Sequence, residues 1–158
     1  MCWNINGWTE RNRKLRYDII TGLNSDVVCL VETHLLNHMT LDIEGYKTIL
    51  HNRMEHHVRT RRGFGGVAFL IKTTIFEDYE VIVLDKEYDG ICVLKLTNKY
   101  TNYTILIFGL YLPPENSPWG RDGLSFFAHV LSCIYQYTDV DAIYVEMLMP
   151  ASAPNKTL

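Results

Sequence analysis

The sequence has few cysteines, and no two of them lie at close spacing. Cys2, Cys29, Cys92 and Cys133 are far apart in the 158-residue chain, and the last three lie inside apolar segments. This spacing excludes a dense disulfide framework and a Cys-x-x-Cys metal site, and it is typical of buried reduced thiols. Reduced thiols favour an intracellular location, which includes the nucleus, over secretion.

The chain also lacks a long apolar run, a secretory leader and an excess of charge of one sign. No apolar segment approaches the length of a membrane span, so no membrane partner is expected. No basic segment with an apolar core and a cleavage site is present at the N-terminus, which argues against secretion. The 15 Lys and Arg against 18 Asp and Glu give a formal net charge of −3. A nucleic-acid partner would therefore have to be held by a local basic patch.

Most of the sequence consists of short apolar runs bounded by turn residues, and these runs predict several strands. Two longer segments have apolar residues every three or four positions and predict helices. Strands with a few long helices favour a single α+β domain in which sheets pack face to face and helices cover the outside. The expected strands are the end of one at residues 2–6, then 27–31, 46–50, 67–71, 80–84, 91–96, 104–111 and 142–145, with helices at 9–23 and 122–137.

Each predicted helix has an apolar stripe that should face a sheet. In the first helix the stripe is Leu15, Ile19 and Leu23, at spacings of four. The basic residues beside it are expected on a solvated face, and they are Arg11, Arg13, Lys14 and Arg16. In the second helix the stripe consists of Leu124, Phe127, Leu131 and Ile134.

Residues 27–31 are an unbroken apolar run that ends at a carboxylate, Glu32. Such a run predicts a strand buried on both faces, although periodicity alone does not distinguish it from a helix segment. Glu32 would lie at the carboxyl end of this strand, where open sheets commonly place ligands. The alternative is that Glu32 is simply the first solvated residue after a core strand.

Two other strand ends carry polar side chains. Asn4 and Asn6 alternate with Trp3 and Ile5, so the two amides share one face of the first strand. Tyr111 closes the strand at 104–111. Because the first helix joins two strands in a βαβ-like unit, their polar ends should lie on the same side of the sheet.

These positions together resemble the motifs of the endonuclease/exonuclease/phosphatase superfamily, which has a DNase I-like fold. Residues Trp3-Asn4-Ile5-Asn6-Gly7 resemble the superfamily's first motif. Residues 26–34 resemble its second motif, in which the metal-binding Glu corresponds to Glu32. Residues 65–69 and 109–114 are similar to later core strands. The segment 115–122 makes the whole most similar to the apurinic-type endonuclease domain of LINE-type retrotransposons.

The resemblance implies a phosphodiesterase or phosphatase that uses Mg²⁺ or Mn²⁺ and, in the endonuclease branch, DNA as its partner. It assigns Glu32 as the metal ligand, which fits because Mg²⁺ prefers hard oxygen ligands and keeps several waters. It gives Asn4 and Tyr111 catalytic roles beside this carboxylate, and all three should converge at one edge of the sheets. The alternatives are a turn-capping side chain for Asn4 and a plain strand aromatic for Tyr111.

Several further side chains are weaker candidates for substrate contact. Asn6 stands where relatives often carry Asp, and an amide there can offer only polar contact. His34 and Arg121 could each contact phosphate or simply be solvated. The cluster of Arg59, Arg61 and Arg62 could hold a DNA backbone by charge, or form a basic loop without this role.

The superfamily's third motif, Gly-Asp-x-Asn, has no counterpart after the strand at 142–145. Its Asp falls on Met147 and its Asn on Met149, and Glu146 is one residue too early to replace the Asp. The Ser-Asp-His motif that supplies the general base is also absent. The resemblance therefore implies a partial four-layer α/β sandwich: a truncated domain at residues 1–145 with a divergent tail at 146–158, inactive as written. The alternatives are a non-catalytic nucleic-acid or protein-binding module and a phosphatase remnant.

Overall fold

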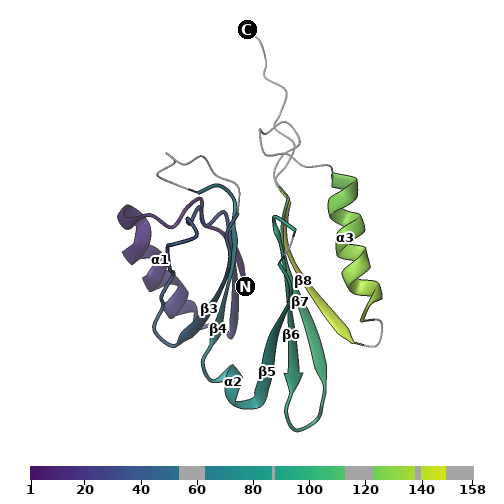
Figure 1. Ribbon diagram of the computed structural model, residues 1–158. Helices are drawn as coiled ribbons and strands as arrows, with labels where there is room; N and C mark the ends of the chain where they lie inside the picture. Colours follow the sequence, from purple (N-terminus) through teal and green to yellow (C-terminus); the bar gives the residue numbers. More distant parts are fainter. Residues whose placement is uncertain (54–62, 87, 113–122, 138–139, 149–158) are drawn as a thin grey trace.

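The computed structural model describes residues 1–53, 63–86, 88–112, 123–137 and 140–148. Within them the chain forms two four-stranded sheets and three helices (Figure 1). In chain order the elements are β1 (Cys2–Asn4), α1 (Glu10–Leu23), β2 (Val27–Val31), β3 (Tyr46–His51), β4 (Val67–Lys72), α2 (Ile75–Asp78), β5 (Tyr79–Asp85), β6 (Ile91–Asn98), β7 (Thr104–Leu112), α3 (Gly123–Tyr135) and β8 (Asp141–Leu148).

The first sheet has the strand order β1-β2-β4-β3, and the second has the order β5-β6-β7-β8. β1 pairs in parallel with β2, so β1, α1 and β2 form the expected βαβ unit. β5, β6 and β7 pair antiparallel, and α3 connects β7 to its parallel neighbour β8. The sheets face each other, with α1 outside the first and α3 outside the second (Figure 1). The predicted α+β class is confirmed, and β8 continues three residues beyond the expected strand at 142–145.

The central core lies between the two sheets. Val31 and Phe69 from the first sheet pack in one buried cluster with Leu94 and Ile107 from the second. The sheets approach closely at Gly109 of β7, where an added Cβ would lie only 2.7 Å from the ring of Phe69. A glycine at this position therefore leaves room for an aromatic ring from the opposite sheet.

Two further clusters attach the helices to the outer faces of the sheets. Ile20 of α1 packs with Val28 and Leu30 of β2, and all three side chains are buried. On the other side, Phe126 of α3 packs against Phe108 of β7. β2 is thus covered on both faces, as the unbroken apolar run predicts.

The predicted apolar face of α1 is wrong. Leu15 and Leu23 are 64% and 55% exposed, whereas the buried residues of this helix are Arg16 and Ile20. The solvated position predicted for Arg16 is therefore also wrong. The helix is turned by about one residue because Arg16 finds backbone acceptors in the turn after β1, so a polar side chain occupies the covered face.

The predicted stripe of α3 is wrong in three of its four positions. Of the predicted stripe, Leu124, Phe127 and Leu131 are exposed, and only Ile134 packs against the sheet. The buried residues of the helix are Phe126 and Val130. Apolar residues occupy more than one face of this helix, so spacing alone does not select the face that is covered. Among the described residues, no helix is both long enough and apolar enough to cross a membrane.

Candidate active site

Glu32 lies in a tight turn directly after β2. Glu32 and His34 both have left-handed backbone conformations, with φ of 53° and 54°, and the residue between them, Thr33, is fully buried. The Glu32 carbonyl accepts a hydrogen bond from the Gly7 N–H (2.6 Å), and the His34 N–H donates to the Gly65 carbonyl (2.9 Å). Left-handed non-glycine residues are unfavourable alone and persist where neighbours hold them, often at functional sites. Here two loops hold the turn, one from each side.

The Tyr111 hydroxyl donates a hydrogen bond to Oε1 of Glu32 at 2.8 Å. The two residues are 79 positions apart in the chain, and they come from different sheets, β7 for Tyr111 and the end of β2 for Glu32. The predicted convergence of Glu32 and Tyr111 is therefore present in the structure. It forms where the two sheets meet at the ends of these strands.

The backbone of Tyr111 is held by the turn before β6. Its N–H donates to the Gly90 carbonyl at 2.8 Å. Gly90 has φ of +86°, and an added Cβ there would lie 2.2 Å from the Tyr111 carbonyl oxygen. Only glycine fits this position without displacing the strand that carries the tyrosine.

The pKa of the Tyr111 phenol is raised well above its ordinary value. Burial of the ring is the main cause, followed by the hydrogen bond to Glu32 and the negative charge of that carboxylate. The phenol therefore remains a neutral hydrogen-bond donor across the physiological range. A neutral donor of this kind can hold a carboxylate or stabilise an anionic oxygen.

Asn4 lies at the same end of the first sheet as Glu32. Its partner in the register of β1 and β2 is Val31, the residue before Glu32. The Asn4 Oδ1 accepts a hydrogen bond from the Asn6 N–H at 3.0 Å, which closes the turn after β1. This contact is the turn-capping arrangement named above as the alternative for Asn4. Asn6 itself is exposed and has φ of 45°.

Arg16 of α1 is hydrogen-bonded to the turn after β1. Its guanidinium donates hydrogen bonds to the carbonyl oxygens of Ile5 and Gly7, and its side chain is buried. The sequence analysis missed this residue because nothing in the pattern distinguishes Arg16 from Arg11 or Arg13. One guanidinium can satisfy two carbonyls of the loop that in turn contacts Glu32 through Gly7.

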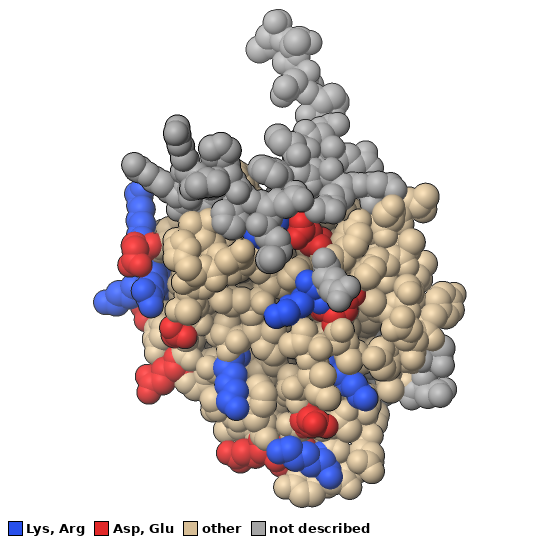
Figure 2. Space-filling view, viewed as in Figure 1, with Lys and Arg blue, Asp and Glu red and all other residues tan. Residues whose placement is uncertain are grey.

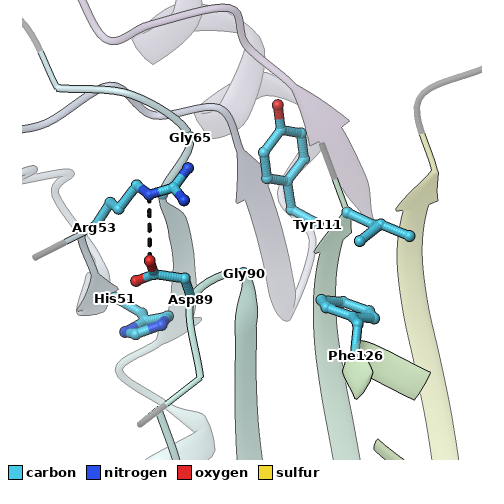
Figure 3. A pocket seen from close by; sticks show the side chains of 9 residues that line it. His51, Arg53, Gly65, Asp89, Gly90, Tyr111 and Phe126 are labelled. Atoms are coloured by element: carbon cyan, nitrogen blue, oxygen red, sulfur yellow. Dashed lines mark ion pairs between the residues drawn. The ribbon is translucent and has the colours of Figure 1, made fainter. Parts of the chain in front are cut away.

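A small cavity of about 20 Å³ lies beside Tyr111 (Figure 3). Arg53 and Asp89 both line it and form an ion pair, with 3.2 Å between Nε and Oδ2, and these side chains are only 10% and 14% exposed. His51 lines the same cavity, and its Nε2 lies 3.0 Å from the Tyr88 carbonyl oxygen. Sequence reasoning missed all three residues, because each stands at the edge of a polar loop and in no recognisable motif.

His34 is placed elsewhere. It lines a hollow of about 390 Å³ together with Trp8, Thr9 and Arg13, beside the start of α1 and apart from the residues that line the cavity at Tyr111. Arg121 and the cluster of Arg59, Arg61 and Arg62 lie outside the described residues. Acidic and basic side chains are interspersed on the face shown in Figure 2, without a large area of one sign among the described residues there.

A sequence model of the Endonuclease/Exonuclease/phosphatase family matches residues 1–136. The chain belongs to this family, as the motifs at residues 3–7 and 26–34 indicated. A search of curated proteins found no match to the chain.

Solved structures have the same fold at low sequence identity. The AP endonuclease LMAP from Leishmania major superposes with a TM-score of 0.66 at 15% identity, over 92% of this chain and 53% of that protein. The APE2 catalytic domain from Xenopus laevis has a TM-score of 0.60 at 18% identity, over 92% of this chain and 56% of that protein. The human Nocturnin catalytic domain has a TM-score of 0.57 at 15% identity, over 91% of this chain and 60% of that protein. The chain thus spans little more than half the length of these neighbours.

Proposed function

We propose that this chain carries part of a divalent-metal-dependent phosphodiesterase site that acts on DNA, of the type found in the endonuclease domains of LINE-type retrotransposons. The observation that carries the proposal is the hydrogen bond between Tyr111 and Glu32, which joins the two sheets at the edge where the motifs meet. Family membership and the AP endonucleases among the structural neighbours support the nuclease branch. The residues 115–122, which favour the retrotransposon type, lie outside the described part of the chain.

The donor set around Glu32 fits Mg²⁺ or Mn²⁺. Glu32 is a half-buried carboxylate, and one hydrogen bond from Tyr111 leaves its oxygens further capacity to bind a cation. Mg²⁺ is commonly held by one or two carboxylates with water completing its shell. A bound ion would neutralise charge on a phosphate. Asn4 and Tyr111 would orient the Glu32 carboxylate and a phosphate oxygen through their amide and phenol.

DNA would be held by local contacts, because the chain has a net charge of −3. Phosphate contacts supply most of the non-specific affinity of such proteins and do not require a uniformly basic surface. Asn6, His34 and Arg121 remain proposed substrate contacts, with His34 on the side of α1.

We further propose that the 158-residue polypeptide on its own cleaves DNA very slowly or not at all. In β8 the residue in register with Tyr111 is Met147, where the family motif places an Asp. A thioether cannot bind Mg²⁺ as a carboxylate does. Loss of a group that stabilises charge on the reacting phosphate costs about 10²–10³-fold in rate.

A plasmid-nicking assay with Mg²⁺ or Mn²⁺ tests this second proposal, with Glu32→Gln as the matched control. We expect no difference between the two proteins, because an incomplete site should not turn over. Nicking by the unmodified chain that disappears in Glu32→Gln would overturn the inactivity proposal and support the site assignment.

Metal binding tests the site separately from turnover. Mn²⁺ titration followed by electron paramagnetic resonance should show weak binding that falls at least tenfold in Glu32→Gln. Met147→Asp adds a carboxylate at the position in register with Tyr111, and it should raise the affinity at least tenfold. Leu124→Asp adds the same charge on an exposed position of α3 and should leave the affinity unchanged. Equal Mn²⁺ binding by the unmodified chain and Glu32→Gln would overturn the metal role of Glu32.

A further inference from the structure

Three side chains of metal-ligand type meet between β5 and α3, away from Glu32. They are Asp85 at the end of β5 and His129 and Cys133 on α3, and their ligand atoms all lie within 4.8 Å of one another. The His129 Nε2 is hydrogen-bonded to Oδ2 of Asp85, and the Cys133 Sγ lies 3.3 Å from the same oxygen. The pocket around them, about 200 Å³ in volume, shares no lining residue with the cavity beside Tyr111.

Local structure explains how these three side chains come together. His129 and Cys133 are four residues apart on α3, so they lie one above the other on the same face of the helix. The register of β5 against β6 shifts between Val83 and Asp85, and bulges of this kind commonly redirect a side chain. The ring of Tyr88 stacks on the imidazole of His129 at 5.2 Å between centroids, which orients the ring toward Asp85. The sequence analysis did not single out this group, because Asp85 lies more than forty residues before the two helical side chains.

From this geometry we propose that Asp85, His129 and Cys133 bind a zinc ion that fixes α3 to the edge of the second sheet. Sulfur, imidazole nitrogen and carboxylate oxygen are the ligand types of Zn²⁺, whereas Mg²⁺ prefers oxygen alone. Tetrahedral Zn²⁺ with its usual bond lengths holds ligand atoms roughly 3.3–3.7 Å apart, close to the separation of Cys133 and Asp85 already present. The pocket leaves space for water as the fourth ligand.

Without a metal, the His129 ring and the Cys133 thiol are both hydrogen-bonded to Asp85, and these contacts attach the helix to the strand. A bound cation would stabilise the Cys133 thiolate and neutralise the Asp85 carboxylate. Zinc binding should therefore release a proton from the thiol.

Titration of chelator-treated, reduced protein with Zn²⁺ and with Co²⁺ tests the proposal. We expect one ion per chain, and the Co²⁺ form should show the near-ultraviolet band of a thiolate ligand together with visible bands of tetrahedral coordination. Zn²⁺ at about a hundredfold above its Kd should raise the thermal unfolding midpoint by about 5–10 °C. The readout does not depend on nuclease activity, so this proposal can fail while the Glu32 site stands.

Cys133→Ser should abolish the near-ultraviolet band and weaken Zn²⁺ binding at least tenfold. Ser132→Ala changes the neighbouring residue in the same pocket, and Glu32→Gln changes the other site, so both should retain the band and the affinity. If Cys133→Ser loses its native circular dichroism spectrum, His129→Gln serves instead, with the same expected loss of affinity. A Co²⁺ form without the thiolate band, or Zn²⁺ affinity unchanged in a folded Cys133→Ser or His129→Gln variant, would overturn the proposal.

Discussion

At the scale of single residues, the turn after β1 depends on the guanidinium of Arg16. This group donates hydrogen bonds to the carbonyl oxygens of Ile5 and Gly7, and all three residues are buried. The same turn contacts the Glu32 carbonyl through the Gly7 N–H. An arginine on the covered face of α1 thus connects the helix to the loop beside the candidate site.

Replacement of Arg16 by Ala should therefore destabilise the protein. We expect a loss of about 2–3 kcal/mol in the free energy of unfolding, because buried carbonyls would lose charge-assisted hydrogen bonds. Arg16→Lys should not restore this stability, since one ammonium lacks the forked geometry that reaches two carbonyls. Arg13→Ala removes an exposed arginine of the same helix and should change stability by less than about 0.5 kcal/mol. Urea unfolding of the variants provides the measurement, and equal losses for Arg16→Ala and Arg13→Ala would contradict the role.

Tyr111 predicts a specific pH dependence. Its pKa is higher in the folded protein than the value of about 10 expected for an unfolded chain, chiefly because the ring is buried. The folded state therefore binds a proton that the unfolded state loses, so the contribution of Tyr111 to stability is complete below about pH 10 and declines as the pH rises further. Urea unfolding between about pH 9 and 11 should show this decline in the unmodified protein. Tyr111→Phe should reduce it, and Tyr100→Phe, which removes an exposed phenol, should not.

At the scale of the element, α3 shows how a sheet selects one face of a largely apolar helix. Phe126 and Phe127 are adjacent in the sequence, yet Phe126 is 1% exposed and Phe127 is 39% exposed. Neighbouring residues on a helix point about 100° apart, so only one of the two rings can reach β7. The buried ring packs with Phe108 and also touches the cavity beside Tyr111.

This difference predicts unequal effects of two matched substitutions. Phe126→Ala should lower the free energy of unfolding by about 3–5 kcal/mol, because it leaves a cavity in the outer core. Phe127→Ala should cost less than about 1 kcal/mol, since much of its ring is already in water. Thermal and urea unfolding compare the two variants. Similar losses would mean that α3 presents a different face to the second sheet.

At the scale of the whole molecule, the two sheets must approach closely for Tyr111 to reach Glu32. Gly109 is in β7 two residues before Tyr111, and Phe69 of the opposite sheet fills the space that its missing side chain leaves. A side chain at Gly109 would push against both Phe69 and Val67 of β4. The inter-sheet packing and the geometry of the site are therefore connected through the same strand.

Two glycine-to-alanine substitutions should consequently have opposite effects. Gly109→Ala should destabilise the protein by about 1–3 kcal/mol, because its Cβ would overlap the Phe69 ring. Gly22→Ala in α1 should stabilise by about 0.5–1 kcal/mol, since an added Cβ meets no atom within 4 Å and alanine favours the helix. Unfolding in urea measures both changes. A neutral Gly109→Ala variant would show that the sheets separate there without cost.

The sequence by itself determined the existence and order of the strands and of the two long helices, but it gave no sign of the short helix α2. Unbroken apolar runs such as residues 27–31 have few alternatives to a buried strand, and local turn chemistry marked where strands end, including the end of β2 at Glu32. The end of the apolar run marked Glu32, whereas the role of Tyr111 was implied only by the resemblance to the superfamily's motifs. Apolar runs and turn residues are short-range signals, so they can be read along the chain.

Only the tertiary structure decided which helix faces are covered and which distant side chains meet. The covered face of α1 depends on two loop carbonyl groups that accept hydrogen bonds from Arg16. The spacing of apolar residues along the helix does not predict where such acceptors lie. The pair of Arg53 and Asp89, and the cluster of Asp85, His129 and Cys133, join residues from separate elements. Their proximity follows from the packing of sheets and helices, which is set by the sum of many weak contacts and not by any local pattern.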